Sequence, residues 1–378
     1  MPVEVAAYYL PHWHADPRND VWHGKGWTEW DLVKAATPRY EGHRQPLVPA
    51  WGHMDDSDPR TFTREIDAAA SHGVTSFLFH FHYFEDGPFL QAALDSGFLH
   101  APNLDRMRFG LMWDNRNWVN VYPARATDNA GTAPLASGKL SPQAFEKMSR
   151  LLVDRYFTHP GYLRLENCPY FSILDLVQFV ESMGGAEQAR EALEGLQLKA
   201  AAAGINGLHL NGVLWHLNDR SRWQQFGGPV ELVASLGLDS VTPLSWLDHY
   251  DLTADTFPRA SYAKAAAANF QCWENESRRW PAPYIPNITV GFDPTPLCCS
   301  TDKFERHAYP YLPVLEGNTP AAVRGAFDHA KLFFSRSDVP IKMLTLTAWN
   351  DWANGAYLLP DNVHGQCYLE MLKKVLAR

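Results

Sequence analysis

The sequence contains little cysteine, no long apolar segment and no concentration of positive charge, and each absence excludes a class of protein. Its 378 residues include five cysteines, an odd number without CxxC spacing, which argues against a zinc ribbon or a disulfide scaffold and indicates reduced thiols. No stretch of about 18 apolar residues is present, so no membrane span is expected. The formal net charge is −9 and no stripe of Lys and Arg occurs, so nucleic acid is not an expected partner.

The first ten residues lack the basic start and the apolar run of a secretion signal, and they are typical of a first strand. Together with the sparse cysteines, this favours a cytoplasmic location. No Gly-rich phosphate-binding loop is found. The pairs His12-x-His14 and His80-x-His82 have same-face spacing on a strand and would suit a metal, but nothing else fixes such a site. We therefore expect neither a metal nor a cofactor.

Aromatic residues, by contrast, are abundant. There are 14 Trp and 15 Tyr, and many of them stand beside Asn, Asp or Gly rather than inside apolar runs. The faces of Trp and Tyr stack well on sugar rings, and their polar tips hydrogen-bond to hydroxyl groups. The alternative is a Trp-rich core. Position separates the two, because core aromatics lie within strands whereas binding aromatics lie where strands end.

Short β-rich runs alternate with longer helical patterns along the whole chain. The predicted strands are 3–10, 74–81, 109–113, 169–174, 207–215, 240–244, 284–290 and 341–348. The predicted helices are 59–72, 87–97, 141–156, 186–203, 230–236, 259–276, 320–335 and 366–376. Eight such units predict an α/β protein, a single (β/α)8 TIM-type barrel formed as one catalytic domain over residues 1–378. The long polar insertions follow strands, which places long βα loops at the C-terminal face.

Polar and aromatic residues gather just after the predicted strands. Four carboxylates are the catalytic candidates: Glu29, Asp114, Asp293 and Asp351. The residues expected to bind the ligand are Tyr9, His14, Trp27, His80, His82, Trp113, Asn115, Arg116, Asn117, Trp118, Trp246, Trp349, Asn350, Asn354 and Tyr357. Trp215 ends the fifth predicted strand and His216 follows it. This mixture suits a carbohydrate, and glycoside chemistry needs at least two acid or base groups beside the anomeric carbon.

Each carboxylate also has a structural interpretation. Asp351 follows an apolar strand and would serve as a loop or cap residue, whereas Asp293 precedes a proline as turn residues do. Asp114 would simply pair with Arg116, and Asp175 would cap the helix that follows it.

Several of these segments resemble WbsX-type proteins, which are similar to glycoside hydrolase family 99. The matching segments are Tyr8-Tyr9-Leu10-Pro11 with His14, Gly24 to Trp30, Gly42-His43 with Gln45-Pro46, Trp113 with Asn115, Asn117 and Trp118, Gly291 with Asp293, and Ala348 to Trp352 through Gly355 to Leu358. The resemblance implies a barrel that acts on glycans. Family 99 comprises retaining endo-α-mannosidases and mannanases, in which one carboxylate assists attack by the sugar's own 2-hydroxyl and another protonates the leaving group.

The chain departs from that pattern at the expected catalytic positions. The usual final block has two Glu residues where this chain has Asp351 and Asn354, and an amide cannot deliver a proton. In the block after the third strand, a carboxylate is lost at Arg116 and one is gained at Asp114. The acid role has therefore migrated, or the site is inactive.

The leading hypothesis is a glycoside hydrolase acting on a bacterial-type polysaccharide or oligosaccharide. Asp351 would be the nucleophile or the base, and the proton donor would be Asp114 or Asp293, with Glu29 less favoured. Arg116 points to an acidic glycan, unless it pairs only with Asp114. The alternatives are a non-catalytic glycan-binding barrel and a glycosyltransferase of polysaccharide biosynthesis.

Overall fold

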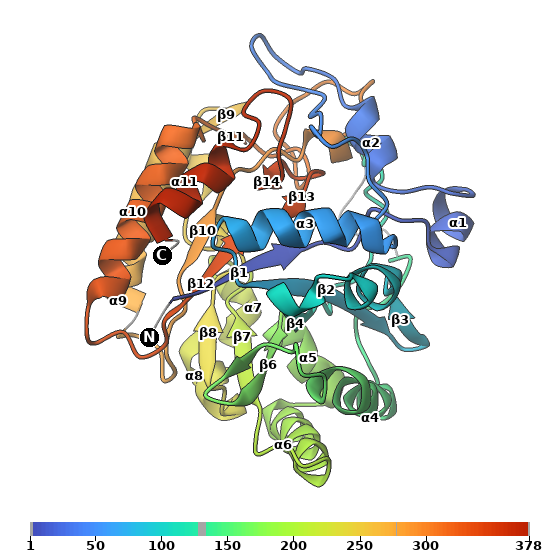
Figure 1. Cartoon of the computed structure of the whole chain (residues 1–378), viewed down its shortest axis with the longest axis vertical. Coiled ribbons are helices and arrows are strands. Elements are labelled where there is room, and N and C mark those ends of the chain that lie inside the picture. The colour runs from blue at the N-terminus through green and yellow to red at the C-terminus, as the bar shows by residue number, and fades with distance from the viewer. Residues whose placement is uncertain (1–2, 128–133, 277, 377–378) are drawn as a thin grey trace.

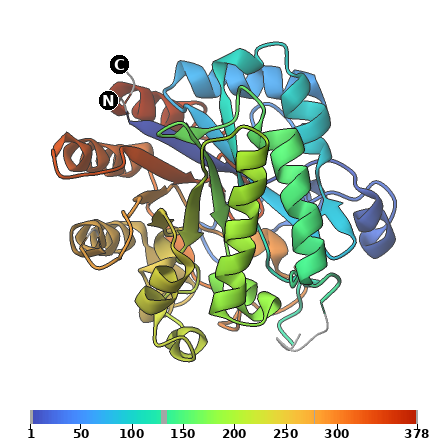
Figure 2. The same ribbon diagram turned by 90° about the horizontal axis from the view of Figure 1, so that it is seen from below.

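The computed structural model describes residues 3–127, 134–276 and 278–376, in which eight parallel strands form a barrel (Figure 1, Figure 2). The strands are β1 (Glu4–Tyr9), β2 (Ser76–Phe84), β4 (Arg108–Trp113), β6 (Cys168–Ile173), β7 (His209–Val213), β8 (Ser240–Thr242), β10 (Asn287–Thr289) and β12 (Met343–Thr347). Their spatial order is β10-β12-β1-β2-β4-β6-β7-β8. Between β8 and β10, the Val241 N–H donates to Pro283 and the Ile285 N–H donates to Val241, which closes the ring. The predicted barrel is confirmed.

Helices cover the outside of the barrel, as the ring of coils around the strands in Figure 2 shows. They are α3 (Pro59–Ser71), α4 (Pro142–Leu151), α5 (Leu176–Met183), α6 (Ala186–Ala202), α8 (Pro229–Leu236), α9 (Tyr262–Glu276), α10 (Pro320–Ser335) and α11 (Cys367–Leu376). Sequence signals fix several of their starts. The side chains of Asp58, Ser141 and Thr319 accept backbone N–H groups at the starts of α3, α4 and α10, and each of these helices has Pro at its first position.

The loops at the carboxyl end of the barrel carry shorter elements. They are α1 (Pro17–His23), α2 (Trp30–Ala35), α7 (Arg220–Gln224), β3 (Gly87–Phe89), β9 (Arg259–Ser261), β11 (Val314–Glu316), β13 (Asn350–Asp351) and β14 (Ala356–Tyr357). The last two pair in an antiparallel hairpin directly after β12. This hairpin holds Asp351 over the end of the barrel.

Side chains alternate along β1 between the outer core and the barrel interior. Tyr9 points outward and packs on Phe62 and Phe79, with ring centroids 5.1 and 4.7 Å away. Tyr8 points inward, where its ring lies edge-on to His80 at 5.8 Å. The barrel interior is partly polar on the side opposite β1. Asn211 of β7 donates to Ser172 (2.7 Å) and accepts from Ser240 (2.8 Å), which links β6, β7 and β8 through their side chains.

Three secondary-structure predictions are wrong in part. The helix predicted at 87–97 begins as the strand β3, antiparallel to β2, and only Ala93–Gly97 is helical, as a single π-helical turn. The helix predicted at 259–276 begins as the strand β9, and α9 begins only at Tyr262. The helix α5 is missing from the prediction, because nearly all its residues are buried and the sequence shows no polar face.

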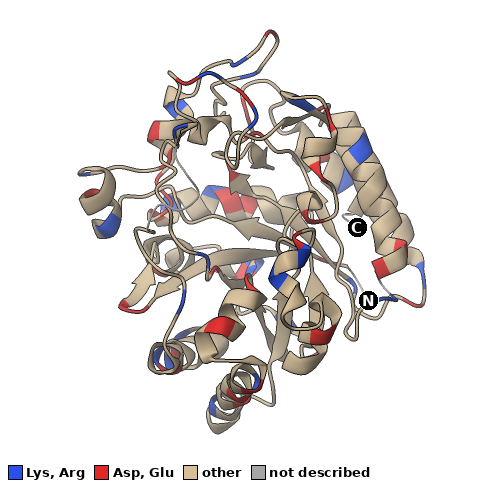
Figure 3. Cartoon of the chain, turned by 180° about the vertical axis from the view of Figure 1, so that it is seen from behind, with Lys and Arg blue, Asp and Glu red and all other residues tan. Residues whose placement is uncertain are grey.

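No helix in the described part of the chain is long and apolar enough to cross a bilayer. All five cysteines are unpaired. Basic and acidic residues are interspersed along the helices and loops in the view of Figure 3, without a continuous basic stripe.

Candidate active site

The carboxyl ends of β1 and β2 bring two imidazoles and a carboxylate together. His12 follows β1, and His82 lies near the end of β2. Their Nε2 atoms are 3.1 Å apart, and His12 Nδ1 lies 2.8 Å from Glu29 Oε1. All three side chains are buried, and Trp118 lies edge-on to both imidazoles. Burial alone would lower the pKa of His12, but the adjacent carboxylate of Glu29 outweighs it and raises the pKa. His12 and Glu29 therefore form a buried ion pair.

Asp114, directly after β4, lies deeper in the same region. Arg116 donates to both of its oxygens, from Nε at 2.8 Å and from Nη2 at 2.5 Å, and His80 Nδ1 lies 2.9 Å from Oδ2. Burial works to raise the pKa of the Asp114 carboxyl, but Arg116 and His80 hold it well below its usual range. Asp114 is therefore a permanent anion that orients its neighbours.

Asp351 occupies the hairpin formed by β13 and β14. The Asn354 backbone N–H donates to its Oδ1 at 3.1 Å, and the Asn354 amide lies 3.1 Å from both carboxylate oxygens. The hydroxyl of Tyr309 donates to Asn354 Oδ1 at 2.8 Å. Burial, and then the charge of Glu29, raise the pKa of Asp351 to about 6 despite these hydrogen bonds. The surroundings of Asp351 therefore favour its protonated form more than water does.

Asp293 lies behind this hairpin. Gln45 donates to its Oδ2 at 2.6 Å, His43 Nε2 lies 2.9 Å from the same oxygen, and the Thr295 N–H donates to Oδ1. The Asp293 N–H donates to the Asn354 carbonyl. Gly355 has φ +64°, and a Cβ there would come within 2.8 Å of the Asp293 Cβ, so the hairpin requires glycine at this position. The structure thus places Asp293 as a support of the Asp351 loop.

Four of the residues predicted to bind ligand are buried behind the strands. Trp113 packs on Phe145 and Phe179, Trp246 packs on Tyr262, and Tyr9 and Trp349 lie in the outer core. All four side chains are fully buried in the structure. Alternation along the strand explains this outcome for Tyr9 and Trp113, each of which is displaced by one residue from an inward-facing position. Trp246 lies instead in the 3-10 turn Trp246–Asp248 after β8, and Trp349 lies just after β12.

Other predicted residues tie loops together. Asn350 accepts from the Leu10 N–H and donates to the Leu10 carbonyl, which joins the hairpin to the end of β1. His14 lies 2.6 Å from Asp56, and Tyr357 donates to Asp361. The side-chain oxygen of Asn117 accepts the Gly138 N–H.

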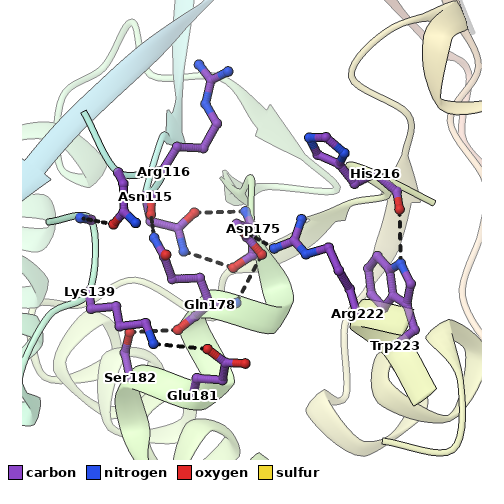
Figure 4. A network of polar contacts seen from close by, with 12 residues as sticks. Asn115, Arg116, Lys139, Asp175, Gln178, Glu181, Ser182, His216, Arg222 and Trp223 are labelled. Carbon is purple, nitrogen blue, oxygen red and sulfur yellow. Dashed lines mark hydrogen bonds and ion pairs between the residues drawn. The ribbon is translucent and has the colours of Figure 1, made fainter. Parts of the chain in front are cut away.

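Asn115, the residue after Asp114, belongs to a further polar network (Figure 4). Asn115 binds the backbone of Asp175 twice, accepting its N–H and donating to its carbonyl, both at 2.8 Å. The Asp175 side chain caps α5 by accepting the Gln178 N–H, as one interpretation of the sequence predicted, and also pairs with Arg222 at 2.5 Å. Asn115 therefore positions the loops after β4 and β6 relative to each other.

Two tyrosines at this end of the barrel are absent from the sequence prediction. The hydroxyl of Tyr309 lies near the charges of Asp351, Arg116 and Glu29, and that of Tyr122 lies near Glu29 and Arg116. The half-buried ring of Trp27 lies edge-on to Tyr122 at 5.5 Å. Both tyrosines come from long loops far from any strand end. Proximity to proline was the only signal for them in the sequence, since each precedes one. Within the described residues, no group of three His, Cys, Asp or Glu is arranged to hold a metal ion.

Comparisons of the sequence with known proteins find a family and two relatives that match along nearly the whole chain. Residues 5–372 match the family described as Glycosyltransferase WbsX. Two proteins from strains of Xanthomonas campestris pv. campestris, each called "Uncharacterized protein WxcX", are 27% identical over 386 residues, covering 100% of this chain and 50% of theirs. The chain thus spans about half the length of the curated relatives it matches.

Two solved structures share the fold at low sequence identity. The GH99 endo-α-mannosidase from Bacteroides thetaiotaomicron has a TM-score of 0.54 at 12% identity, covering 98% of this chain and 96% of that one. A protein described as glycoside hydrolase-like has a TM-score of 0.59 at 15% identity, covering 100% and 95%. These likenesses support the barrel fold.

Proposed function

The chain belongs to the WbsX glycosyltransferase family, and we propose that it cleaves glycosidic bonds with Asp351 and Glu29 as its two acting carboxylates. One arrangement carries the proposal: Glu29 and Asp351 are both buried at the carboxyl end of the barrel, Glu29 against His12 and Asp351 against Asn354. In keeping with it, burial and then the charge of Glu29 raise the pKa of Asp351 to about 6. Glycosidases work with two carboxyl groups in unlike environments, one of which holds a proton. The resemblance to family 99 and the fold of the solved relatives support glycan cleavage.

In this proposal Asp351 is the proton donor. It transfers its proton to the leaving oxygen as the glycosidic C–O bond breaks. Glu29, paired with His12, is the charged carboxylate that assists attack by water or by the sugar's 2-hydroxyl. These roles reverse the expectation from the sequence, in which Asp351 was the nucleophile or the base.

The other two candidate carboxylates suit proton donation less well. Arg116 and His80 hold the pKa of Asp114 far below the range in which it would carry a proton. Asp293 accepts hydrogen bonds from Gln45 and Thr295 and lies beside His43. We propose that Asp114 and Asp293 instead hold the neighbouring side chains and loops in place.

The test measures new reducing ends after incubation of the whole chain with a panel of bacterial polysaccharides. We expect release by the wild type, and a loss of about 100-fold or more in kcat for Glu29→Gln, because the amide cannot assist the attack. Glu41→Gln is the matched control, since Glu41 is exposed in the same N-terminal segment. Full activity of Glu29→Gln on a substrate that the wild type cleaves would contradict the assignment. Binding of glycans without any cleavage would favour the non-catalytic alternative.

The Asn354 amide gives a prediction about pH. It lies within hydrogen-bonding distance of both oxygens of ionised Asp351 and so lowers the pKa of that carboxyl. In Asn354→Ala, the alkaline limb of the kcat/KM profile should move upward by about one unit, the equivalent of one charged hydrogen bond of about 1.5 kcal/mol. Asn362→Ala, at an exposed position of the following loop, should leave the limb in place. If the alkaline limb of Asn354→Ala stayed at the wild-type pH, Asp351 would not be the group that transfers the proton.

The family description favours glycosyl transfer as a second candidate. That reaction requires an activated sugar donor and a sugar acceptor. Calorimetric binding of a nucleotide sugar, together with formation of a lengthened product, would favour transfer over cleavage.

A further inference from the structure

Two arginines lie against the ring of Trp215 at the carboxyl end of the barrel. Trp215 follows β7 by two residues and packs, half-buried, on the apolar cluster inside the barrel. The guanidinium carbons of Arg116 and Arg222 lie 5.5 and 5.0 Å from its ring centroid. Both distances are within the range of cation–π contact. An aromatic surface is thus combined with two positive charges from different loops.

Each arginine is held from behind by a buried carboxylate. The side chains of Asp114 and Asp175 are only 1% and 6% exposed, whereas those of Arg116 and Arg222 are 35% and 23% exposed. The two ion pairs are joined through Asn115, which follows Asp114 in the chain and bonds to the backbone of Asp175 (Figure 4). The carboxylates therefore fix the guanidinium groups, and the guanidinium groups form the accessible side of each pair.

The guanidinium group of Arg116 keeps N–H donors on the accessible side of its ion pair. A guanidinium has five N–H donors, and Asp114 takes two of those of Arg116. Burial, and then the charge of Arg222, lower the pKa of the neighbouring His216, whereas Asp175 acts in the opposite direction.

We infer that Trp215, Arg116 and Arg222 form a subsite for a sugar that carries a carboxylate, a uronic acid. The planar guanidinium fork matches a carboxylate in two-point contact, and the indole offers an apolar edge to the sugar ring. The subsite adjoins the proposed catalytic group, because the hydroxyl of Tyr309 lies near the charges of both Asp351 and Arg116 and donates to Asn354. The inference rests on the proposed function only in that glycans bind at this end of the barrel.

The test compares binding of glucuronate, galacturonate and mannuronate with their neutral partners glucose, galactose and mannose, by saturation-transfer NMR and titration. We expect at least one uronate to bind about 10-fold or more tightly than its neutral partner at low salt, and the preference to shrink as salt is added. Because binding is read without turnover, the result is independent of whether the chain hydrolyses any glycan.

Variants of Arg222 connect the preference to this subsite. Arg222→Gln should lower the affinity for the uronate about 10-fold and leave the neutral sugar unaffected. Arg222→Lys keeps a charge against Asp175 and thereby the fold, and it should lose part of the preference because the fork is gone. Arg220→Gln, an exposed position on the same helix α7, should change nothing. The inference is overturned if no uronate is preferred, if both Arg222 variants retain the full preference, or if UDP-glucose binds at Arg222 while the uronates do not.

Discussion

Asp351→Asn is expected to lower kcat by about 1,000-fold or more while leaving the fold intact or more stable. The reason for the first effect is that an amide carries no proton that it can give to a leaving oxygen, and in the proposed mechanism no neighbouring group replaces it. Asn354, which stands where the family pattern has a second acid, cannot do so either. Turnover is measured on the same polysaccharide that the wild type cleaves.

The second effect follows from the raised pKa. A carboxyl whose pKa rises on folding from 3.8 to about 6 favours the folded state while it is protonated, and this contribution is lost as the pH rises through that interval. At pH 7 the ionised, buried Asp351 therefore costs roughly 2–3 kcal/mol. Asn removes that cost, so the melting temperature of the variant should equal or exceed that of the wild type at pH 7. The difference in melting temperature between the variant and the wild type should vanish near pH 4.

The combination of lost activity and retained stability distinguishes a catalytic carboxyl from a structural one. A structural Asp would lose stability on replacement, as expected where a capping or loop hydrogen bond is broken. Asp86→Asn is the matched control, since Asp86 is 73% exposed and should affect neither property. Asp351→Asn with full activity, or with a melting temperature several degrees lower at pH 7, would contradict the assignment.

The raised pKa of Asp351 also sets the pH dependence of the wild-type activity. With Asp351 as the donor, kcat/KM should fall about 10-fold per unit as the pH rises above about 6. If Asp351 acted instead as the base, as the sequence alone led us to expect, the fall would occur below pH 6. Whether kcat/KM falls above or below pH 6 therefore decides whether Asp351 is the proton donor or the base.

Most of the barrel could be predicted from the sequence because its strands are short, apolar and regularly followed by helical patterns. The strand ends were less predictable. Residues 284–290 read as one strand, but only Asn287–Thr289 forms the ladder with β12, while Ile285 bonds across to β8. Extended backbone and ladder pairing share the same residue preferences, so a sequence cannot separate them.

The candidate site was predictable where it lies beside strand ends and not elsewhere. Asp114 and Asp351 follow their strands within a few residues, and the rule that barrel sites use these positions found both. The same rule chose Trp113 and Trp349, whose rings face the outer core, because the face of a terminal residue depends on the register of the strand. Tyr309 comes from a long loop and Arg222 from the short helix α7, which lies within the loop after β7, and no local pattern encodes the course of either loop.

Arg116→Met is expected to destabilise the fold by about 3–5 kcal/mol at pH 7, the usual cost of leaving one member of a buried ion pair alone. Asp114 is almost fully enclosed, and Arg116 supplies both of its strongest contacts. The free energy of unfolding in urea measures the effect. Arg60→Met offers the matched comparison, because Arg60 is 90% exposed and pairs with Asp58 on the surface. That variant should leave the free energy of unfolding nearly unchanged, because an exposed ion pair is screened by water.

A double variant shows whether the lost stability comes from the unpaired Asp114 carboxylate or from lost packing. In Asp114→Asn/Arg116→Met neither member of this pair is charged, so most of the lost stability should return. The pH dependence should agree. Arg116 keeps the pKa of Asp114 low, so the pair stabilises the wild type above pH 3.8 and this contribution is lost as the pH falls further. In Arg116→Met, acidification instead lets the stranded carboxyl take up a proton, and its deficit relative to the wild type should shrink. A double variant as unstable as the single one would assign the role of Arg116 to packing.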